Sequence, residues 1–251
     1  MDKSWVPAGV PRLSLRFTAM DLTYLGHSCF LCVSGKVRIV VDPFISSNPM
    51  AADVNMASLH PTHVLLTHSH ADHVADAEAL LGLSGAELVA PYEVATWFGA
   101  RGASRCTPVN PGGRIMLQVD GDVVTVRVVG AVHSSTLPDG SSGGVACGYV
   151  MEAGGTRVYH AGDTDLSMEM ELIGRYWTPD VALLPIGGQF TMGYDDVPAA
   201  MEMLRCKRVV GMHYDTFPPI TIDKNEAIRS VGDAGGELHL PEIGMVLENA
   251  I

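Results

Sequence analysis

Short runs of aliphatic and β-branched residues, each ended by turn residues, recur along almost the whole chain. Such runs predict strands, and the dipeptide Ser34-Gly35 predicts a hairpin turn between two of them. Helical periodicity lies between the runs, so we expect two packed sheets with helices outside them. The expected strands cover 13–18, 22–25, 30–33, 37–41, 64–67, 87–90, 114–119, 123–129, 145–152, 157–160, 181–185, 208–212 and 245–247. The expected helices cover 72–81, 92–99, 165–176, 195–204 and 223–231.

Composition and charge limit the kind of protein that this chain can be. It has 251 residues, of which 47% are apolar, and a net charge of 16 − 28 = −12. A field of that sign repels phosphate backbones, so we expect no nucleic-acid partner. No apolar run approaches the roughly 20 residues that a membrane span needs, and no secretory signal is visible. The odd count of five cysteines favours a reduced, cytoplasmic setting. Without a linker or repeat, we expect one domain over 1–251, with 1–12 as an N-terminal extension.

One string dominates the sequence: Thr67-His68-Ser69-His70-Ala71-Asp72-His73, where an expected strand gives way to an expected helix. Any one of these histidines alone would more often be a solvated or hydrogen-bonded side chain. His68 and His70, two apart in extended backbone, project to the same side. Asp72 and His73 follow in the first helical turn and suit a second metal close to the first. Neutral imidazoles and a carboxylate are ligands for divalent cations, and the string contains no thiolate for a cysteine-type zinc site.

Three further residues of ligand type lie just beyond expected strands. His133 follows the run 123–129, Asp163 follows the run 157–160, and His213 follows the run 208–212. Each has an ordinary alternative, since Asp163 could cap the next helix and the two histidines could be loop residues. Side chains at strand ends converge on one edge of a sheet sandwich, where binding sites normally lie. The repeated placement therefore favours one common site.

These residues give the chain a family resemblance. The string from His68 to His73, followed in order by His133, Asp163 and His213, resembles the metallo-β-lactamase superfamily. Within it, the chain looks like the short bacterial metal-dependent hydrolases related to the L-ascorbate-6-phosphate lactonases. The supporting strings, between residues 24 and 218, are Tyr24-Leu25-Gly26-His27-Ser28, Val41-Asp42-Pro43-Phe44, Tyr159-His160-Ala161-Gly162-Asp163-Thr164, Leu184-Pro185-Ile186-Gly187-Gly188-Gln189-Phe190-Thr191-Met192 and Met212-His213-Tyr214-Asp215-Thr216-Phe217-Pro218.

The resemblance implies an αββα sandwich of two mixed sheets with a dinuclear metal site between them. Asp42 matches an aspartate that hydrogen-bonds ligand side chains, although an Asp-Pro turn after a strand is the commoner interpretation. His27 matches a position that lines the site, and a buried histidine with a backbone partner is an equal alternative. The implied ligands are His68, His70 and His133 for one ion, Asp72, His73 and His213 for the other, and Asp163 as the bridge.

Such a site suits hydrolysis. A pair of divalent ions lowers the pKa of a shared water, giving hydroxide near neutral pH, and polarises a carbonyl or phosphoryl oxygen. We expect Asp72 and Asp163 to position this nucleophile, and His27 is the first candidate for protonating the leaving group. Zn²⁺ is the first expectation for the metal, and Mn²⁺ or Fe²⁺ accept the same ligands. The expected pocket residues are Gly187, Gly188, Gln189, Thr191 and Thr216, although the two glycines could simply form a turn before the next helix.

The remaining motifs do not compete with this site. Cys29 and Cys32 form a pair at redox or zinc spacing, but they lie in an expected strand, where buried packing is the better interpretation. The chain has no nucleophile elbow, Walker sequence or dinucleotide fingerprint. The expected function is therefore hydrolysis of a small-molecule ester or lactone by a metal-bound hydroxide, in a chain that could form a homo-oligomer. A phosphodiesterase or phospholipase-like activity at the same site, and a non-catalytic metal-bound binding or sensor module, stay open as alternatives.

Overall fold

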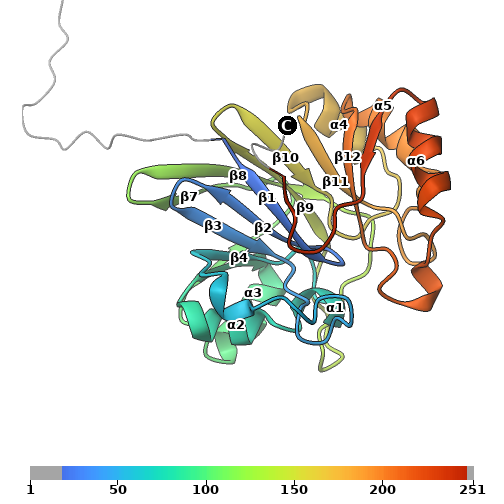
Figure 1. The fold of residues 1–251 in the computed structure, drawn as a ribbon. Coiled ribbons are helices and arrows are strands. Elements are labelled where there is room, and N and C mark those ends of the chain that lie inside the picture. Colours follow the sequence, from blue (N-terminus) through green and yellow to red (C-terminus); the bar gives the residue numbers. More distant parts are fainter. Residues whose placement is uncertain (1–18, 248–251) are drawn as a thin grey trace, which may run out of the picture.

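The computed structural model describes residues 19–247, whose strands form two sheets of seven strands each (Figure 1). The first sheet has the order β14-β1-β2-β3-β4-β5-β6. β1 to β3 are antiparallel neighbours, whereas β3 to β6 run parallel to one another. The strands are β1 (Asp21–Gly26), β2 (Cys29–Ser34), β3 (Val37–Val41), β4 (His63–Leu65), β5 (Glu87–Pro91), β6 (Cys106–Val109) and β14 (Val246–Leu247).

The second sheet repeats the same mixed pattern, with the order β13-β12-β11-β10-β9-β8-β7. β7 to β10 form an antiparallel meander, and β10 to β13 run parallel to one another. Two mixed sheets are the fold class that the resemblance implies, and the prediction is confirmed. The strands are β7 (Arg114–Val119), β8 (Asp122–Gly130), β9 (Cys147–Ala153), β10 (Thr156–His160), β11 (Val181–Pro185), β12 (Arg208–Met212) and β13 (Glu237–His239).

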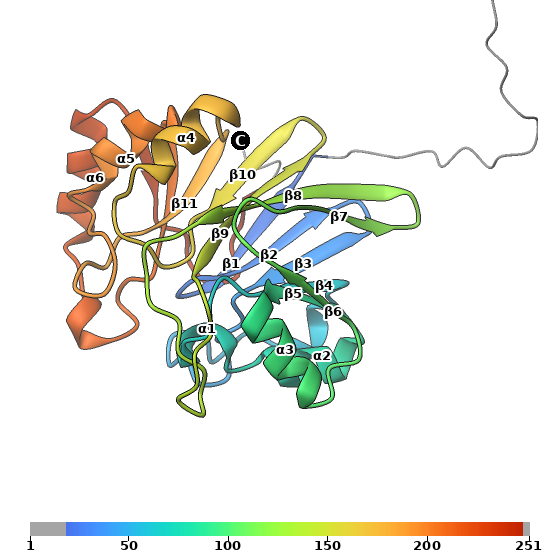
Figure 2. The same ribbon diagram turned by 180° about the vertical axis from the view of Figure 1, so that it is seen from behind.

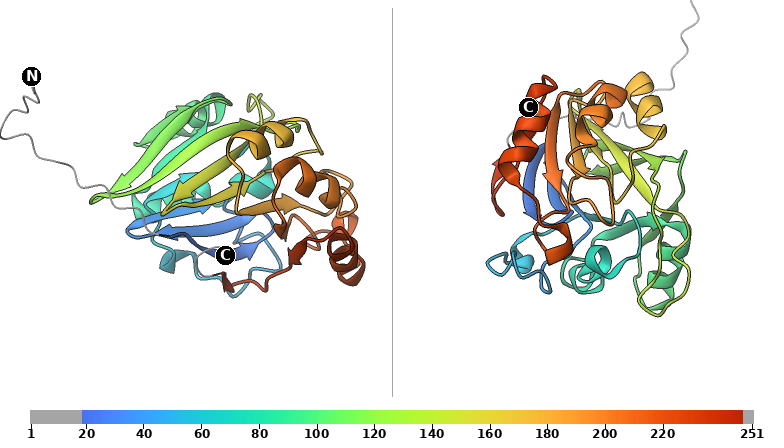
Figure 3. Two further views of the ribbon diagram at one scale, coloured as in Figure 1. Left: turned by 90° about the horizontal axis from the view of Figure 1, so that it is seen from above. Right: turned by 90° about the vertical axis from the view of Figure 1, so that its right-hand side faces the viewer.

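Helices cover the outer faces of both sheets, as the views from behind and from the side show (Figures 2 and 3). α1 (Ala71–Val74), α2 (Ala77–Ser84) and α3 (Tyr92–Ala100) lie beside the first sheet, with the short 3₁₀ turn η1 (Met56–Ser58). α4 (Glu169–Tyr176), α5 (Val197–Leu204) and α6 (Lys224–Asp233) lie beside the second, and η2 (Pro218–Ile220) precedes α6. Across residues 19–247, no helix combines the length and the apolarity that crossing a bilayer requires.

Two hydrophobic clusters hold these layers together. The larger one lies between the sheets and contains Phe30 and Ile39 from the first sheet, and Val126 and Tyr149 from the second, all fully buried. The smaller one lies between the first sheet and its helices, and it includes Leu88. Because apolar side chains on both faces of each sheet leave water, the sheets and helices stack as helix, sheet, sheet and helix.

The expected helix over 72–81 is wrong in one respect, because the chain divides it into α1 and α2. The carboxylate of Asp76, at the break, accepts hydrogen bonds from the backbone N–H groups of Ile45 (2.6 Å) and Ser46 (2.9 Å). Its own N–H donates to the carbonyl of Pro43 at 3.1 Å. Asp76 is therefore bound to the loop that follows β3, and the first helical segment ends before it.

Two strands of the structure are not predicted from the sequence. β6 contains Pro108 and lies at a sheet edge, where a missing N–H is tolerated. β13 has only three residues, at the edge of the other sheet, and it lacks a buried face that would give an alternating pattern. The expected strand over 13–18 and the N-terminal extension over 1–12 lie outside the described residues.

Candidate metal centre

The carboxyl ends of strands from both sheets carry the histidines and aspartates of the candidate site. After β4 the chain stays extended as far as His70, whose φ is −64° and ψ is 150°, and it then enters α1. α1 contains Asp72 and His73. His133, Asp163 and His213 lie in the loops after β8, β10 and β12. Parallel strands of one sheet end at the same edge, so these loops lie close together. They bring together the seven residues that the sequence singles out: His68, His70, Asp72, His73, His133, Asp163 and His213.

Asp163 lies in the middle of this cluster and is almost fully buried. Its Oδ2 lies 3.0 Å from Nε2 of His213 and 3.3 Å from Nε2 of His73. The same oxygen lies 3.5 Å from Nε2 of His133 and 3.9 Å from Nε2 of His68. One carboxylate oxygen therefore contacts imidazoles that come from both of the expected ligand groups.

The remaining ligand-type residues that the sequence singles out fall into two groups, and a third group joins Asp42 to His68 and His73. Within each group the atoms lie within 4.8 Å of one another. The side chains of Asp72 and His133 are 26% and 12% exposed, so the cluster opens to solvent on their side. The first group comprises His68, His70 and His133, and the second comprises Asp72, His73, His213 and His27.

Asp42 and Thr67 determine which ring nitrogen carries the proton in two of these histidines. Asp42 is fully buried after β3 and accepts hydrogen bonds from Thr67 N (2.8 Å), Thr67 Oγ1 (2.7 Å) and His73 Nδ1 (2.9 Å). Since the Thr67 hydroxyl donates to Asp42, it accepts from Nδ1 of His68, 3.0 Å away. Both histidines thus carry a proton on Nδ1. Their Nε2 atoms lie on the side of Asp163, where a metal ion would replace any proton held there.

Several buried polar atoms at the centre have no hydrogen-bond partner among the residues that the structure describes. They are Nε2 of His73, Oδ1 of Asp163 and Nδ1 of His213. An unpaired buried polar group costs about 1–3 kcal/mol, so three of them around one centre indicate a partner that the side chains do not supply. Imidazole nitrogens and carboxylate oxygens are ligands that divalent transition metals prefer. The donor set therefore fits a metal centre.

The charge states of the cluster also suit a cation. Burial favours the neutral acid, but the neighbouring His73 and His213 hold the pKa of Asp163 well below its usual value. Burial lowers the pKa of His68, His70 and His133, so these imidazoles are neutral near pH 7. For His73 burial also acts downward, but Asp163 and Asp42 outweigh it and hold the pKa well above the usual value. The site thus stabilises positive charge between two carboxylates.

His27 contacts the cluster from the turn between β1 and β2. Its Nε2 lies 3.2 Å from Oδ2 of Asp72, and its Nδ1 lies 3.0 Å from Oγ1 of Thr216. Burial lowers the pKa of His27 to about 4, although the hydrogen bond that His27 donates to Asp72 acts in the opposite direction. A neutral His27 donates Nε2–H to the carboxylate and accepts the Thr216 hydroxyl at Nδ1. Its carbonyl also accepts a hydrogen bond from His213 N at 2.9 Å, so His27 contacts two residues of the cluster.

The expected pocket residues lie on two loops beside the cluster. Thr216 lines a hollow of about 270 Å³ next to His27. The other four belong to the loop between β11 and α5, which is closed by a bridge between Gly187 and Gly193. A Cβ at Gly187 would overlap with the carbonyl of His213, so the loop packs directly on that residue. The four residues are Gly187, Gly188, Gln189 and Thr191.

A larger hollow, of about 780 Å³, lies at the opposite end of the first sheet. His63 and Glu87, at the amino ends of β4 and β5, line it together with residues of β7. None of the residues of the metal cluster lines it. The volume of a hollow alone therefore does not identify the functional site in this protein. The histidines and aspartates at the strand ends identify it.

Sequence reasoning misses two residues that shape the site. Thr67 belongs to the histidine string, but the string predicts no role for its side chain. The position of Thr67 between a strand end and a histidine is a usable signal. His160 is fully buried and donates Nε2–H to the carbonyl of Ser28 at 2.9 Å, while its Nδ1 accepts from Gly162 N at 3.2 Å. It thereby joins the loop of Asp163 to the turn of His27. The cysteines at 29 and 32 are buried and free, as expected from packing.

Comparison with known proteins agrees with the fold and the cluster. The sequence model of the β-lactamase superfamily domain matches residues 21–213. A UPF0173 metal-dependent hydrolase of Thermus thermophilus is 43% identical over 228 residues, which cover 91% of this chain and 98% of the relative. One of Methylacidiphilum infernorum is 41% identical over 214 residues, covering 85% and 93%.

Comparison with solved structures supports the same fold and family. Igni18, described as a novel metallo hydrolase from the hyperthermophilic archaeon Ignicoccus hospitalis, superposes with a TM-score of 0.83. Its sequence is 35% identical, and the match covers 92% of this chain and 98% of that one. The same fold, the buried histidine–aspartate cluster and identity of about 40% to named hydrolases lead to one assignment. The chain belongs to the metallo-β-lactamase superfamily and, within it, to the UPF0173 metal-dependent hydrolases.

Proposed function

We propose that the protein is a dinuclear metallohydrolase that cleaves an ester or lactone of a small molecule. The observation that carries the proposal is the position of Asp163 Oδ2, which lies 3.3 Å from Nε2 of His73 and 3.5 Å from Nε2 of His133. An oxygen close to imidazoles of two ligand groups suits a carboxylate shared by two ions. The proposed ligands are His68, His70 and His133 for one ion, Asp72, His73 and His213 for the other, and Asp163 for both.

Two divalent ions, with Zn²⁺ first and Mn²⁺ or Fe²⁺ as alternatives, supply a water of lowered pKa and polarise the carbonyl oxygen of the substrate. The chain supplies orientation. Asp163 is buried and ionised, and Asp72 has the most exposed carboxylate of the cluster, so we assign it to orient the attacking water where substrate enters. Thr216 and His27 hold Asp72 in place through the hydrogen bonds described above.

The sequence also named His27 as the candidate for protonating the leaving group. Its burial and its lowered pKa of about 4 favour the positioning of Asp72 over proton donation. We therefore assign His27 to the positioning of Asp72. The His27→Gln and His27→Asn variants test this role against proton donation to the leaving group. The five cysteines are free, which agrees with the proposed cytoplasmic setting.

The test is to remove metal, reconstitute the protein with Zn²⁺ or Mn²⁺, and assay lactones, carboxylic esters, thioesters and phosphodiesters. We expect two ions per chain and turnover of the lactone or ester substrates. Asp163→Ala should abolish turnover and lower the number of bound ions, because it removes the carboxylate that would serve both ions. Asp165→Asn, an exposed aspartate two residues further on, is the matched control and should behave as the wild type.

Three results would contradict the proposal. Turnover that survives in Asp163→Ala would remove the bridging role, and fewer than two ions in the reconstituted wild type would remove the dinuclear centre. Two bound ions without turnover of any substrate class would favour the metal-bound binding or sensor module instead.

A further inference from the structure

The loops that surround the metal cluster carry no lysine or arginine. Their ligand residues come from the carboxyl ends of the strands, so these loops form the entrance to the site. Aspartate, in contrast, occurs in every one of them. The loops cover residues 42–55, 66–76, 131–146, 161–168, 186–196 and 213–223.

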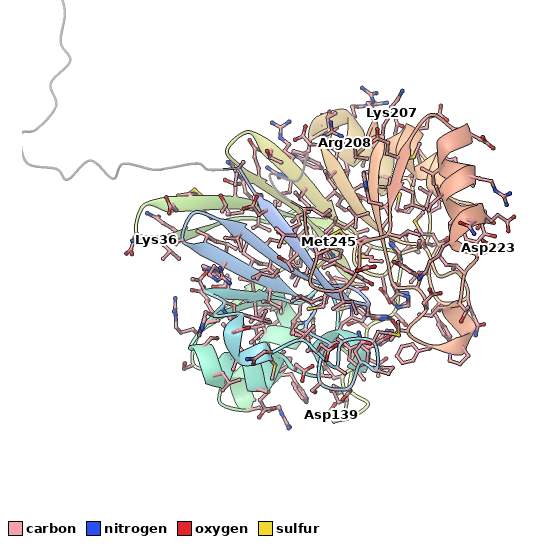
Figure 4. The ribbon with its side chains drawn as sticks, in the orientation of Figure 1. Lys36, Asp139, Lys207, Arg208, Asp223 and Met245 are labelled. Carbon is pink, nitrogen blue, oxygen red and sulfur yellow. The ribbon has the colours of Figure 1, made fainter. Side chains whose placement is uncertain are left out.

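Among the described residues, Arg101 and Lys224 are the basic residues with contacts to these loops. The Arg101 guanidinium lies 4.3 Å from the centre of the Trp97 ring, and Nε1 of Trp97 donates to Asp139 at 2.6 Å. Figure 4 shows Lys207 and Arg208 at the end of the molecule opposite Asp139, which belongs to one of the entrance loops. Lys224, the first residue of α6, directly follows the last of these loops and lines the hollow next to His27 together with Thr216. Its Nζ lies 2.9 Å from Oδ2 of Asp215 and 5.4 Å from the centre of the Tyr214 ring, so its charge is already paired.

Apolar side chains stand at the entrance instead. Phe190, which is 53% exposed, lies on the loop closed by the Gly187–Gly193 bridge, and Val132, which is 55% exposed, directly precedes His133. Both segments bind Thr164, the residue after Asp163. Val132 N donates to its Oγ1 at 3.1 Å, and Met192 N donates to its carbonyl at 2.9 Å. The segments that carry Phe190 and Val132 are thus both bound to the residue that follows Asp163 in the chain.

A third apolar residue completes the entrance on the side of His27. The ring centre of Phe217, which is half-buried, lies 5.6 Å from that of His27 and 6.1 Å from that of Phe44. Exposed apolar side chains that gather around one polar centre commonly mark a surface that a ligand covers. Here the ligand would meet aromatic and aliphatic groups, and beyond the metal centre it would meet carboxylates.

These observations restrict the substrate of the proposed hydrolase. The metal centre would take up the reacting carbonyl group. A phosphate or carboxylate elsewhere on the substrate would face the aspartates of the entrance loops, because Lys224 is already paired with Asp215 and Arg101 is stacked on Trp97. Resting on the proposed function, we infer that the substrate is an uncharged ester or lactone that bears an apolar group and no second anionic group. The apolar group lies against Phe190, Val132 and Phe217.

The test compares two substrates that share one scissile bond. One is a 4-nitrophenyl ester with a straight alkanoyl chain, and the other is the ester of the same length with a terminal carboxylate. For the metal-loaded protein we expect kcat/KM to be about tenfold or more higher for the uncharged ester. Phe190→Ala should raise the KM for the alkanoyl ester about tenfold. The KM for 4-nitrophenyl acetate, which serves as a short-chain control, should stay almost unchanged, because only the longer chain reaches the entrance.

A charge introduced at the entrance separates the electrostatic part of the inference. Phe190→Lys should lower the preference for the uncharged ester about tenfold or reverse it, and the effect should shrink at high salt. Leu83→Lys is the matched control, because Leu83 is 63% exposed on α2 and lies outside the entrance loops. A hydrolysis-inert lactam with an alkyl chain gives a binding readout without turnover. By calorimetry it should bind about tenfold more weakly to Phe190→Ala.

The outcomes are distinct. Equal or faster hydrolysis of the carboxylate-bearing ester, or lactam binding that is unaffected in Phe190→Ala, would overturn this inference and leave the hydrolase proposal standing. Failure of the protein with two ions bound to hydrolyse these esters and every lactone, thioester and phosphodiester of the wider panel would overturn the hydrolase proposal, and this inference with it.

Discussion

Thr67 is the residue whose replacement most directly tests how the metal centre is held. Thr67→Val keeps the branched shape of the buried side chain and removes only its hydroxyl. That hydroxyl donates to Asp42 at 2.7 Å and accepts from Nδ1 of His68 at 3.0 Å. The variant therefore loses a hydrogen bond to a charged group and leaves the N–H of His68 buried without a partner.

The size of the effect follows from these two contacts. A hydrogen bond to a charged group contributes about 1.5–3 kcal/mol, and an unsatisfied buried donor costs about 1–3 kcal/mol. Because both contacts share one oxygen, we expect the free energy of unfolding of the metal-free Thr67→Val protein to fall by about 2–4 kcal/mol. His68 would also lose the contact that keeps its proton on Nδ1, so its affinity for metal should fall about 10–100-fold.

Calorimetric titration of the metal-free protein with Zn²⁺ and with Mn²⁺ measures the affinity, and urea unfolding measures the stability. Thr67→Ser, which retains the hydroxyl, should recover most of both.

A second threonine–histidine pair at the other end of β4 provides the matched control. Thr62 Oγ1 donates to the carbonyl of Arg38, accepts from Arg38 N and lies 2.9 Å from Nδ1 of His63. Thr62→Val should therefore lose comparable stability with unchanged metal affinity. Wild-type affinity for both ions in Thr67→Val, or an equal loss of affinity in Thr62→Val, would refute the assigned role of Thr67.

Three further predictions follow from the same contacts. His27→Gln, whose amide nitrogen can replace Nε2 as the donor to Asp72, should stay within about tenfold of wild-type kcat/KM, whereas His27→Asn should lose about 100-fold. Equal losses in both, together with loss of the alkaline limb of the pH profile, would support proton donation instead. Burial raises the pKa of the Cys32 and Cys147 thiols to about 12. At pH 8 both thiols should therefore resist a disulfide reagent until the protein is unfolded in guanidinium. Rapid labelling of these two cysteines in the native protein would contradict this prediction. Adding metal to the chelated protein at about 100 times its dissociation constant should stabilise it by about 2.7 kcal/mol for each ion bound, measured by thermal or urea unfolding. An unchanged midpoint would argue against binding to the folded state.

The sequence was sufficient to predict which residues meet, because the ligand types stand at strand ends in chain order. Each strand is a short aliphatic run, and the first polar residues after it identify the sheet edge. His133, Asp163 and His213 each lie one to three residues beyond a β-strand of the structure. A local pattern of this kind survives folding, since strand direction alone decides at which edge the following loop lies.

The sequence did not predict the contacts that orient these residues. Asp42 meets Thr67 only because β3 pairs in parallel with β4, with Val41 opposite Leu65. A shift of that register by one residue would turn the side chains of β4 to the opposite face. The break between α1 and α2 is equally non-local, because nothing in the helical pattern reveals that Asp76 binds the loop after β3. Tautomers, helix breaks and the apolar entrance all depend on pairs that only the tertiary structure creates.

The arrangement of the centre favours a catalytic role for the metal over a structural one. A structural ion is enclosed by its ligands and often provides the energy that folds the chain. Here a large apolar core already joins the two sheets, and direct hydrogen bonds connect the loops of the site across them. Nε2 of His160 donates to the carbonyl of Ser28, and the backbone N–H of His213 donates to the carbonyl of His27. Neither bond uses an atom that the candidate metal site needs as a ligand. The chain can therefore fold around a preformed cluster that opens to solvent at Asp72, which leaves the metal free to act on a substrate.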